Sequence, residues 1–212
     1  MDQANFIQAL CADLGPVSPR AVERRFVQAL VIGGAIALAC LLFSLGIQPE
    51  LAGRRLVPFV TKAAYTACLA LVAFNLACVL ARPGRAPGRR WLLLAAPVAV
   101  IAILATLELA RTPQAAWTAH LMGVSWRQCP VRVMALAAPI FAALCWAFRQ
   151  QAPVRLRATG AVAGLLAGAG AAALYALACT EASAAFVLVW YSLGILGATA
   201  IGALVGPALL RW

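Results

Sequence analysis

Apolar residues occur along this chain in long, nearly uninterrupted runs, separated by short segments rich in Arg, Gly and Pro. A helix needs about 20 apolar residues to cross the hydrocarbon core of a bilayer. The pattern predicts six such helices, at residues 26–47, 63–81, 91–110, 133–148, 158–178 and 184–210. The fourth run is short and is expected to begin nearer Cys129, whereas the sixth is long and is expected to tilt or project.

Composition supports this interpretation. Of the 212 residues, 65% are hydrophobic and 11% are charged, and the mean hydropathy is +0.93. A soluble domain carries about a quarter charged residues. The sequence therefore predicts an all-α polytopic membrane protein with a six-helix transmembrane domain at residues 26–212, preceded by a segment at residues 1–25.

The net charge of +11 comes from Arg clusters that lie between the apolar runs. This distribution is typical of topology signals, and it argues against direct binding of nucleic acid. Eleven of the 17 basic residues fall on segments that share a side with the N-terminus. The positive-inside rule then predicts that both termini are cytoplasmic, and it places Cys129 and Cys179 at the outer face.

The segment before the first run has the pattern of a short amphipathic helix. Its predicted apolar face consists of Phe6, Ile7, Leu10 and Leu14. Such a helix binds either the membrane surface or the groove of a partner. The segment has no basic residue before Arg20, which favours a partner.

Two runs carry glycines at every fourth position, a spacing that lets helices approach closely. These residues are Gly160, Gly164 and Gly168 in the fifth run, and Gly202 and Gly206 in the sixth. The predicted spans contain almost no ionisable groups. Because transport needs a polar path, this argues against the alternative of a small transporter or channel.

Cys129 and Cys179 differ from the other five cysteines because each lies at the end of a predicted span near the outer face. Three interpretations are open: the two cysteines form a static disulfide, they are a thiol pair that reacts or binds a soft metal ion, or they are unrelated. His120 and Glu181 are candidates to complete a metal site. The absence of a C-x-x-C motif disfavours a membrane thiol-disulfide enzyme, and no catalytic residues are assigned.

Several segments occur in an order and spacing that resemble one family. They are "FIQALCADLGPV", "ARPGR", the Cys129-Pro130 pair followed by Pro139, "QQAPVRLRATGAVAGLLAGA", "ACTEASAAFVLVWYSLG" and "LLRW". Together they resemble the NrsF-type membrane anti-sigma factors, negative regulators of an extracytoplasmic-function sigma factor.

The resemblance implies a protein of the bacterial inner membrane that holds a sigma factor inactive. It also implies that Cys129 and Cys179 are periplasmic and sense heavy-metal or oxidative stress. One departure is at Trp190-Tyr191, where family members often have Trp-His. A role of that histidine therefore does not carry over to this chain.

Overall fold

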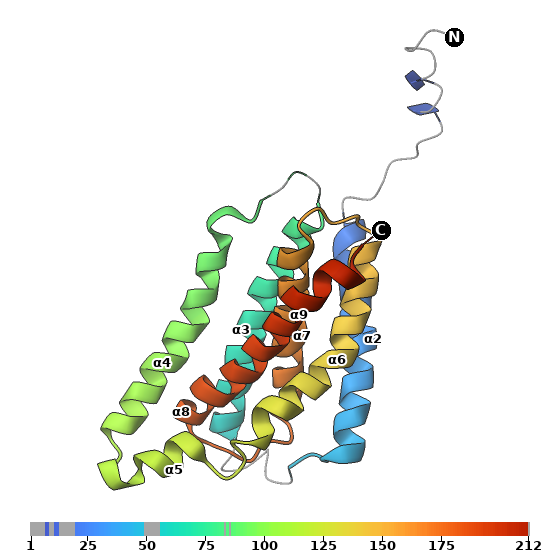
Figure 1. Ribbon diagram of the computed structural model, residues 1–212. Helices are drawn as coiled ribbons and strands as arrows, with labels where there is room; N and C mark the ends of the chain where they lie inside the picture. Colours follow the sequence, from blue (N-terminus) through green and yellow to red (C-terminus); the bar gives the residue numbers. More distant parts are fainter. Residues whose placement is uncertain are drawn as a thin grey trace.

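The computed structural model describes residues 7–8, 11–12, 20–48, 56–82, 84 and 86–211. All regular elements within these ranges are helical, which confirms the predicted all-α class. Among the described residues, six helical segments are long and apolar enough to cross a membrane (Figure 1). They are α2 (Ala21–Ser44), α3 (Leu56–Leu80), η1 and α4 (Gly88–Leu94 and Ala95–Ala110), α6 (Gln128–Arg149), α7 (Leu156–Tyr175), and α8, η3 and α9 (Ala184–Phe186, Val187–Tyr191 and Ser192–Leu209).

Each predicted run corresponds to one of these segments, but the ends differ. Helix α6 begins at Gln128, so the fourth span does start beside Cys129. Helix α3 begins at Leu56, about two turns before the predicted boundary at residue 63. Lys62 therefore lies inside α3 and is buried, with 2% of its surface exposed. The predicted span of residues 63–81 left Lys62 outside, so the structure corrects the start of this span and adds one buried ionisable group to it.

Helix α7 forms the centre of the bundle. It packs against α9, α6, α3 and α2, and most of its residues are buried. Small side chains make this possible, because Ala and Gly predominate in its sequence. The long helix α4 lies at the edge of the bundle, away from α7 (Figure 1).

The five glycines of the predicted packing stripes lie at the crossing of α7 and α9. A Cβ atom added to Gly160 would overlap the Gly202 carbonyl oxygen and lie 2.8 Å from the Gly206 Cα. One added to Gly164 would overlap the Ala198 carbonyl oxygen, and one added to Gly168 would lie 3.1 Å from the Ile195 Cα. The two backbones thus touch directly, and at Gly160 and Gly164 a larger residue would not fit unless α9 moved away.

The two ends of the bundle differ in character. At one end, α2 begins and α9 finishes, so we call it the terminal end (Figure 1). At the other end, residues 45–48, 111–127 and 176–183 join the long helices. We call this the cysteine end, because Cys129 and Cys179 lie there. A short helix α5 (Trp117–Met122), preceded by the turn η2 (Gln114–Ala116), closes it between α4 and α6.

The predicted N-terminal helix falls almost entirely outside the described residues. Phe6, Leu10 and Leu14 are not described. Residues 7–8 and 11–12 are helical, and Ile7 is exposed. Helix α2 begins at Ala21, five residues before the predicted first span.

Candidate functional site

Two free thiols lie together in the core at the cysteine end. Cys129 is in the first turn of α6 and Cys179 follows the last turn of α7, and they are 0% and 2% exposed. Backbone hydrogen bonds fix both residues, since the Cys129 amide donates to the Ser125 carbonyl and the Cys179 amide to the Tyr175 carbonyl, each at 2.9 Å. The two thiols lie within electrostatic range of one another.

Tyr191 is buried in the same core as the two thiols. It ends the π-helical turn η3, and its ring lies 5.9 Å from that of Tyr175 between ring centroids. Its buried hydroxyl lies beside the Cys179 thiol but makes no hydrogen bond of normal geometry within the described part of the chain. Single π turns inside α-helices often occur at functional sites. The Tyr191 hydroxyl is therefore a hydrogen-bond donor available to a sulfur atom that becomes anionic.

Lys62 reaches the same region from α3. Its Nζ atom donates hydrogen bonds to the carbonyl oxygens of Cys179 and Glu181, both at 2.7 Å. The ammonium also lies within electrostatic range of the Cys129 thiol. Buried charges are tolerated where hydrogen bonds replace the lost water. Lys62 thus connects α3 to the backbone on both sides of Thr180.

Glu181 holds the segment that precedes α6 and leads to Cys129. We call residues 117–127 the cover segment. The Oε1 atom of Glu181 accepts hydrogen bonds from the Val124 amide at 2.8 Å and from the Ser125 amide and hydroxyl at 3.0 and 3.1 Å. Gly123 makes this possible, because its φ of 55° suits glycine and an added Cβ atom would lie 2.6 Å from the carboxylate.

Tryptophans attach the cover segment to the last span. The Trp190 Nε1 donates to the Leu121 carbonyl at 2.8 Å, and the rings of Trp126 and Trp190 contact each other in a tilted arrangement, with centroids 5.1 Å apart and an interplanar angle of 46°. The Arg127 guanidinium lies over the Trp126 ring, 4.9 Å from its centroid. Both tryptophans pack against the core that contains the two cysteines.

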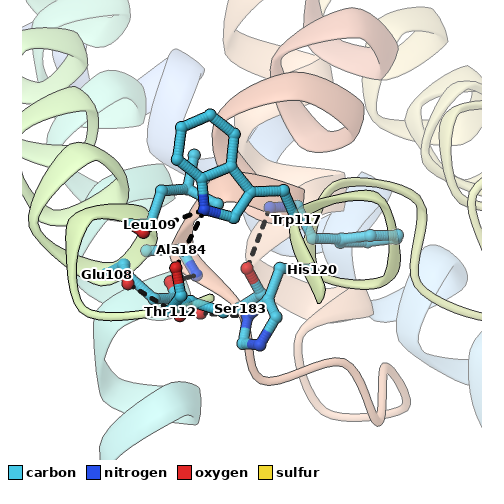
Figure 2. Close-up of polar contacts among 8 residues, drawn as sticks. Glu108, Leu109, Thr112, Trp117, His120, Ser183 and Ala184 are labelled. Atoms are coloured by element: carbon cyan, nitrogen blue, oxygen red, sulfur yellow. Dashed lines mark hydrogen bonds and ion pairs between the residues drawn. The ribbon is translucent and has the colours of Figure 1, made fainter. Parts of the chain in front are cut away.

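Glu108, at the end of α4, fastens the other side of the cover segment (Figure 2). Its Oε1 atom lies 2.9 Å from the His120 Nδ1, and its Oε2 atom accepts the Ala184 amide at 2.6 Å. Trp117 adds a second connection to α4, because its Nε1 donates to the carbonyls of Leu109 and Thr112, both at 3.0 Å. The single histidine of the chain is therefore committed to a carboxylate on a neighbouring helix.

Replacing Gly123 by Ala is expected to loosen the cover segment and destabilise the protein by about 1–3 kcal/mol. The added methyl group meets the Glu181 carboxylate in a backbone conformation that nearly excludes side chains. Thermal unfolding of the purified protein in detergent measures the effect. Gly46→Ala is the matched control, since Gly46 also has a positive φ of 71° but has open space around it. Equal losses of thermal stability in the two variants would contradict the expected clash between the added methyl group and the Glu181 carboxylate.

The sequence-predicted metal ligands do not converge. His120 pairs with Glu108, and the Glu181 carboxylate is bound by the cover segment, although it lies within electrostatic range of Cys129. Within the described residues, no three His, Cys, Asp or Glu side chains form a cluster that could hold a metal ion. The two thiols supply soft donors, but the four protein ligands of a structural zinc site are not assembled there.

Sequence reasoning did not identify Lys62, Glu108 or Tyr191 as members of this site. A signal for Lys62 was present: it is the only lysine in a chain whose other 16 basic residues are all arginine. Tyr191 was noted only as a departure from the family pattern. Glu108 and His120 are 12 residues apart, and their pairing depends on how α5 folds back on α4.

Within the described part of the chain, fold and site define an α-helical protein with six helices long enough to cross a membrane and two buried thiols at one end. Residues 10–212 match the family described as "Negative regulator of sigma F", NrsF. The chain belongs to the NrsF family, which confirms the resemblance seen in the sequence.

Two curated relatives match over nearly their whole length. The chain is similar to the anti-sigma-F factor NrsF of Caulobacter vibrioides (strain NA1000 / CB15N), with 36% identity over 210 residues and 98% of each chain covered. It is also similar to the probable anti-sigma-F factor NrsF of Azospira oryzae, with 33% identity over 213 residues and 100% of each covered. No solved structure matches the chain.

Proposed function

We propose that this protein is an anti-sigma factor of the bacterial inner membrane. It binds a sigma factor of the extracytoplasmic-function type on the cytoplasmic side, keeps it inactive, and releases it when Cys129 and Cys179 react with a heavy metal or an oxidant. Family membership and the names of both relatives support the anti-sigma role. It is a regulatory role, without a catalytic step.

The observation that carries the sensing role is the pairing of two free thiols from separate helices. Cys129 belongs to α6 and Cys179 to the end of α7, and α6 and α7 pack along each other. An oxidant would join the two sulfur atoms in a disulfide and receive two electrons and two protons. A soft cation would instead bind the thiolates after both protons leave. Either reaction links α6 to α7 by a new bond.

The new bond can reach the partner only if it favours one arrangement of the bundle over another. Helix α7 is well placed for this, because it contacts four other long helices. A change in the relation between α6 and α7 at the cysteine end therefore alters packing along the whole bundle. Cores respond to such changes by switching between discrete arrangements rather than by continuous deformation.

The orientation of the helices supports a cytoplasmic partner at the terminal end. Helix α2 begins and α9 ends on the side of the bundle away from the cysteines (Figure 1). Most basic residues also belong to segments on that side. With the terminal end in the cytoplasm, the cysteine end faces the periplasm, where signals arrive. The segment of residues 1–25, with its predicted apolar face, then lies where a sigma factor is available.

Deleting residues 2–14 is expected to weaken capture of the sigma factor at least about tenfold, an effect of about 1.4 kcal/mol. The deletion removes the predicted apolar face while leaving α2 and every helix that follows it complete. Co-purification of the sigma factor from solubilised inner membranes measures the effect.

Two point variants sharpen this test. Leu10→Glu places a charge on the predicted apolar face, and Gln8→Glu adds the same charge on the opposite face. Only Leu10→Glu should reduce capture. Unchanged capture by the deletion would show that the partner binds elsewhere, and no capture by the intact chain would refute the anti-sigma role.

A further inference from the structure

Lys62 stands out among the described ionisable residues because it lies inside α3 and is buried at its Nζ atom against two backbone carbonyls. Lysine is a flexible side chain that usually keeps its ammonium in water. Fixing it in the core costs free energy, which the hydrogen bonds must offset. The position therefore indicates a specific task for the ammonium beyond filling space.

The two acceptors are informative. They are the carbonyl oxygens of Cys179 and Glu181, which lie on either side of Thr180. One ammonium thus fixes the backbone that directs the Cys179 thiol to the core and the backbone that directs the Glu181 carboxylate to the cover segment. Neither carbonyl belongs to the regular hydrogen bonding of a helix, because α7 ends at Tyr175 and α8 begins at Ala184.

The consequences extend from this loop to the second thiol. The Glu181 carboxylate binds the amides of Val124 and Ser125. The Ser125 carbonyl in turn accepts the amide of Cys129 at 2.9 Å. A continuous series of hydrogen bonds therefore runs from Lys62 through the loop of residues 179–181 and the cover segment to the start of α6. The backbones of both cysteines take part in this series, and both side chains are buried.

We propose that Lys62 is the positioning residue of the cysteine pair: its ammonium holds the loop of residues 179–181 so that the cover segment stays closed over both thiols, and it thereby sets how fast reagents reach them. The importance of this access for signalling rests on the proposed function. The rate at which reagents reach the two thiols depends on the structure alone and can be measured without the sigma factor. A reagent must wait for a local opening, whose frequency is set by the free energy of breaking these hydrogen bonds.

The test is the rate at which N-ethylmaleimide labels each cysteine in the full-length protein in detergent, resolved by peptide mass spectrometry. Lys62→Met keeps a long unbranched side chain but removes the donor. We expect it to raise the labelling rates of Cys129 and Cys179 at least about tenfold, which corresponds to about 1.4 kcal/mol of opening free energy. Cys145 is the internal control, because it is also buried and lies farther along α6. Its rate should stay unchanged.

Two further variants separate positioning from shape. Lys62→Arg retains a cationic donor and should keep labelling close to that of the unchanged protein. Glu181→Ala leaves Lys62 in place but frees the cover segment, and should raise both rates as Lys62→Met does. Three results would each overturn the proposal. In Lys62→Met, the labelling rates of Cys129 and Cys179 could stay unchanged, or they could rise no more than the labelling rate of Cys145. Alternatively, the two cysteines could be labelled as fast in Lys62→Arg as in Lys62→Met.

Release of the sigma factor is measured on the same variants, so the two proposals can fail separately. If the labelling rates change as expected and release does not, Lys62 positions the thiols but the thiols do not sense. If labelling is insensitive to Lys62 while release still requires the cysteines, sensing stands and the positioning role falls.

Discussion

Replacing both Cys129 and Cys179 by Ser is expected to leave binding of the sigma factor intact and to abolish its release by Cd²⁺ or by diamide, a dithiol oxidant. Serine is close to cysteine in size and fits two buried positions, but its oxygen neither forms a disulfide nor binds soft cations well. A reaction that biases the bundle by about 3 kcal/mol changes sigma-factor affinity about 150-fold. In the double variant, the change should fall below about twofold, or about 0.4 kcal/mol.

The measurement is the affinity of the purified protein for its sigma factor, with and without each reagent. Cys145→Ser is the matched control, since Cys145 is a buried cysteine of the same helix as Cys129 but lies away from the cysteine end. This control should respond like the unchanged protein. A double variant that still releases the sigma factor would remove Cys129 and Cys179 from the sensing step.

Replacing Gly160 by Ala is expected to destabilise the protein by about 1–3 kcal/mol or more, as overpacking of a core does. Alanine has a higher helix propensity than glycine, so the substitution would stabilise the protein if helix propensity were the main effect. The crossing decides instead, because the added methyl group would overlap the Gly202 carbonyl oxygen and lie 2.8 Å from the Gly206 Cα. These are backbone atoms of α9, which cannot move aside as a flexible side chain does.

Thermal unfolding in detergent measures this loss. Gly34→Ala is the control, because Gly34 lies inside a helix and an added Cβ atom there has nothing within 4 Å. It should leave stability unchanged or raise it slightly. A Gly160→Ala protein as stable as Gly34→Ala would mean that α7 and α9 separate at little cost, and that their close crossing is not a main source of stability.

The sequence predicted the all-α class, the six apolar helices and the residues of the close crossing, because each depends on a local pattern. Run length predicts a span, and glycine at every fourth position predicts a face without side chains. Helix ends were predicted less well. The predicted span of residues 63–81 left Lys62 outside. In the structure α3 begins at Leu56, and the carbonyls of Cys179 and Glu181 bind the buried Lys62 ammonium.

The cover segment could not be predicted for a similar reason. Residues 111–127 have no strong periodicity, and α5 depends on contacts made by distant residues such as Glu108 and Glu181. His120 and Glu181 were proposed as metal ligands from their chemistry alone. Each is instead bound by a backbone or side-chain partner that only the folded chain brings near.

The burial of α7 has a consequence for how the protein is made. Among the six long helices of the described chain, α7 is the least apolar and the most buried. During synthesis, the glycine face of α7 lacks its partner until α9, which follows α7 in the chain, has also been made. A chain truncated before α9 would leave the glycine face of α7 uncovered. We therefore expect such truncated chains to be degraded faster in cells than the chain that includes α9.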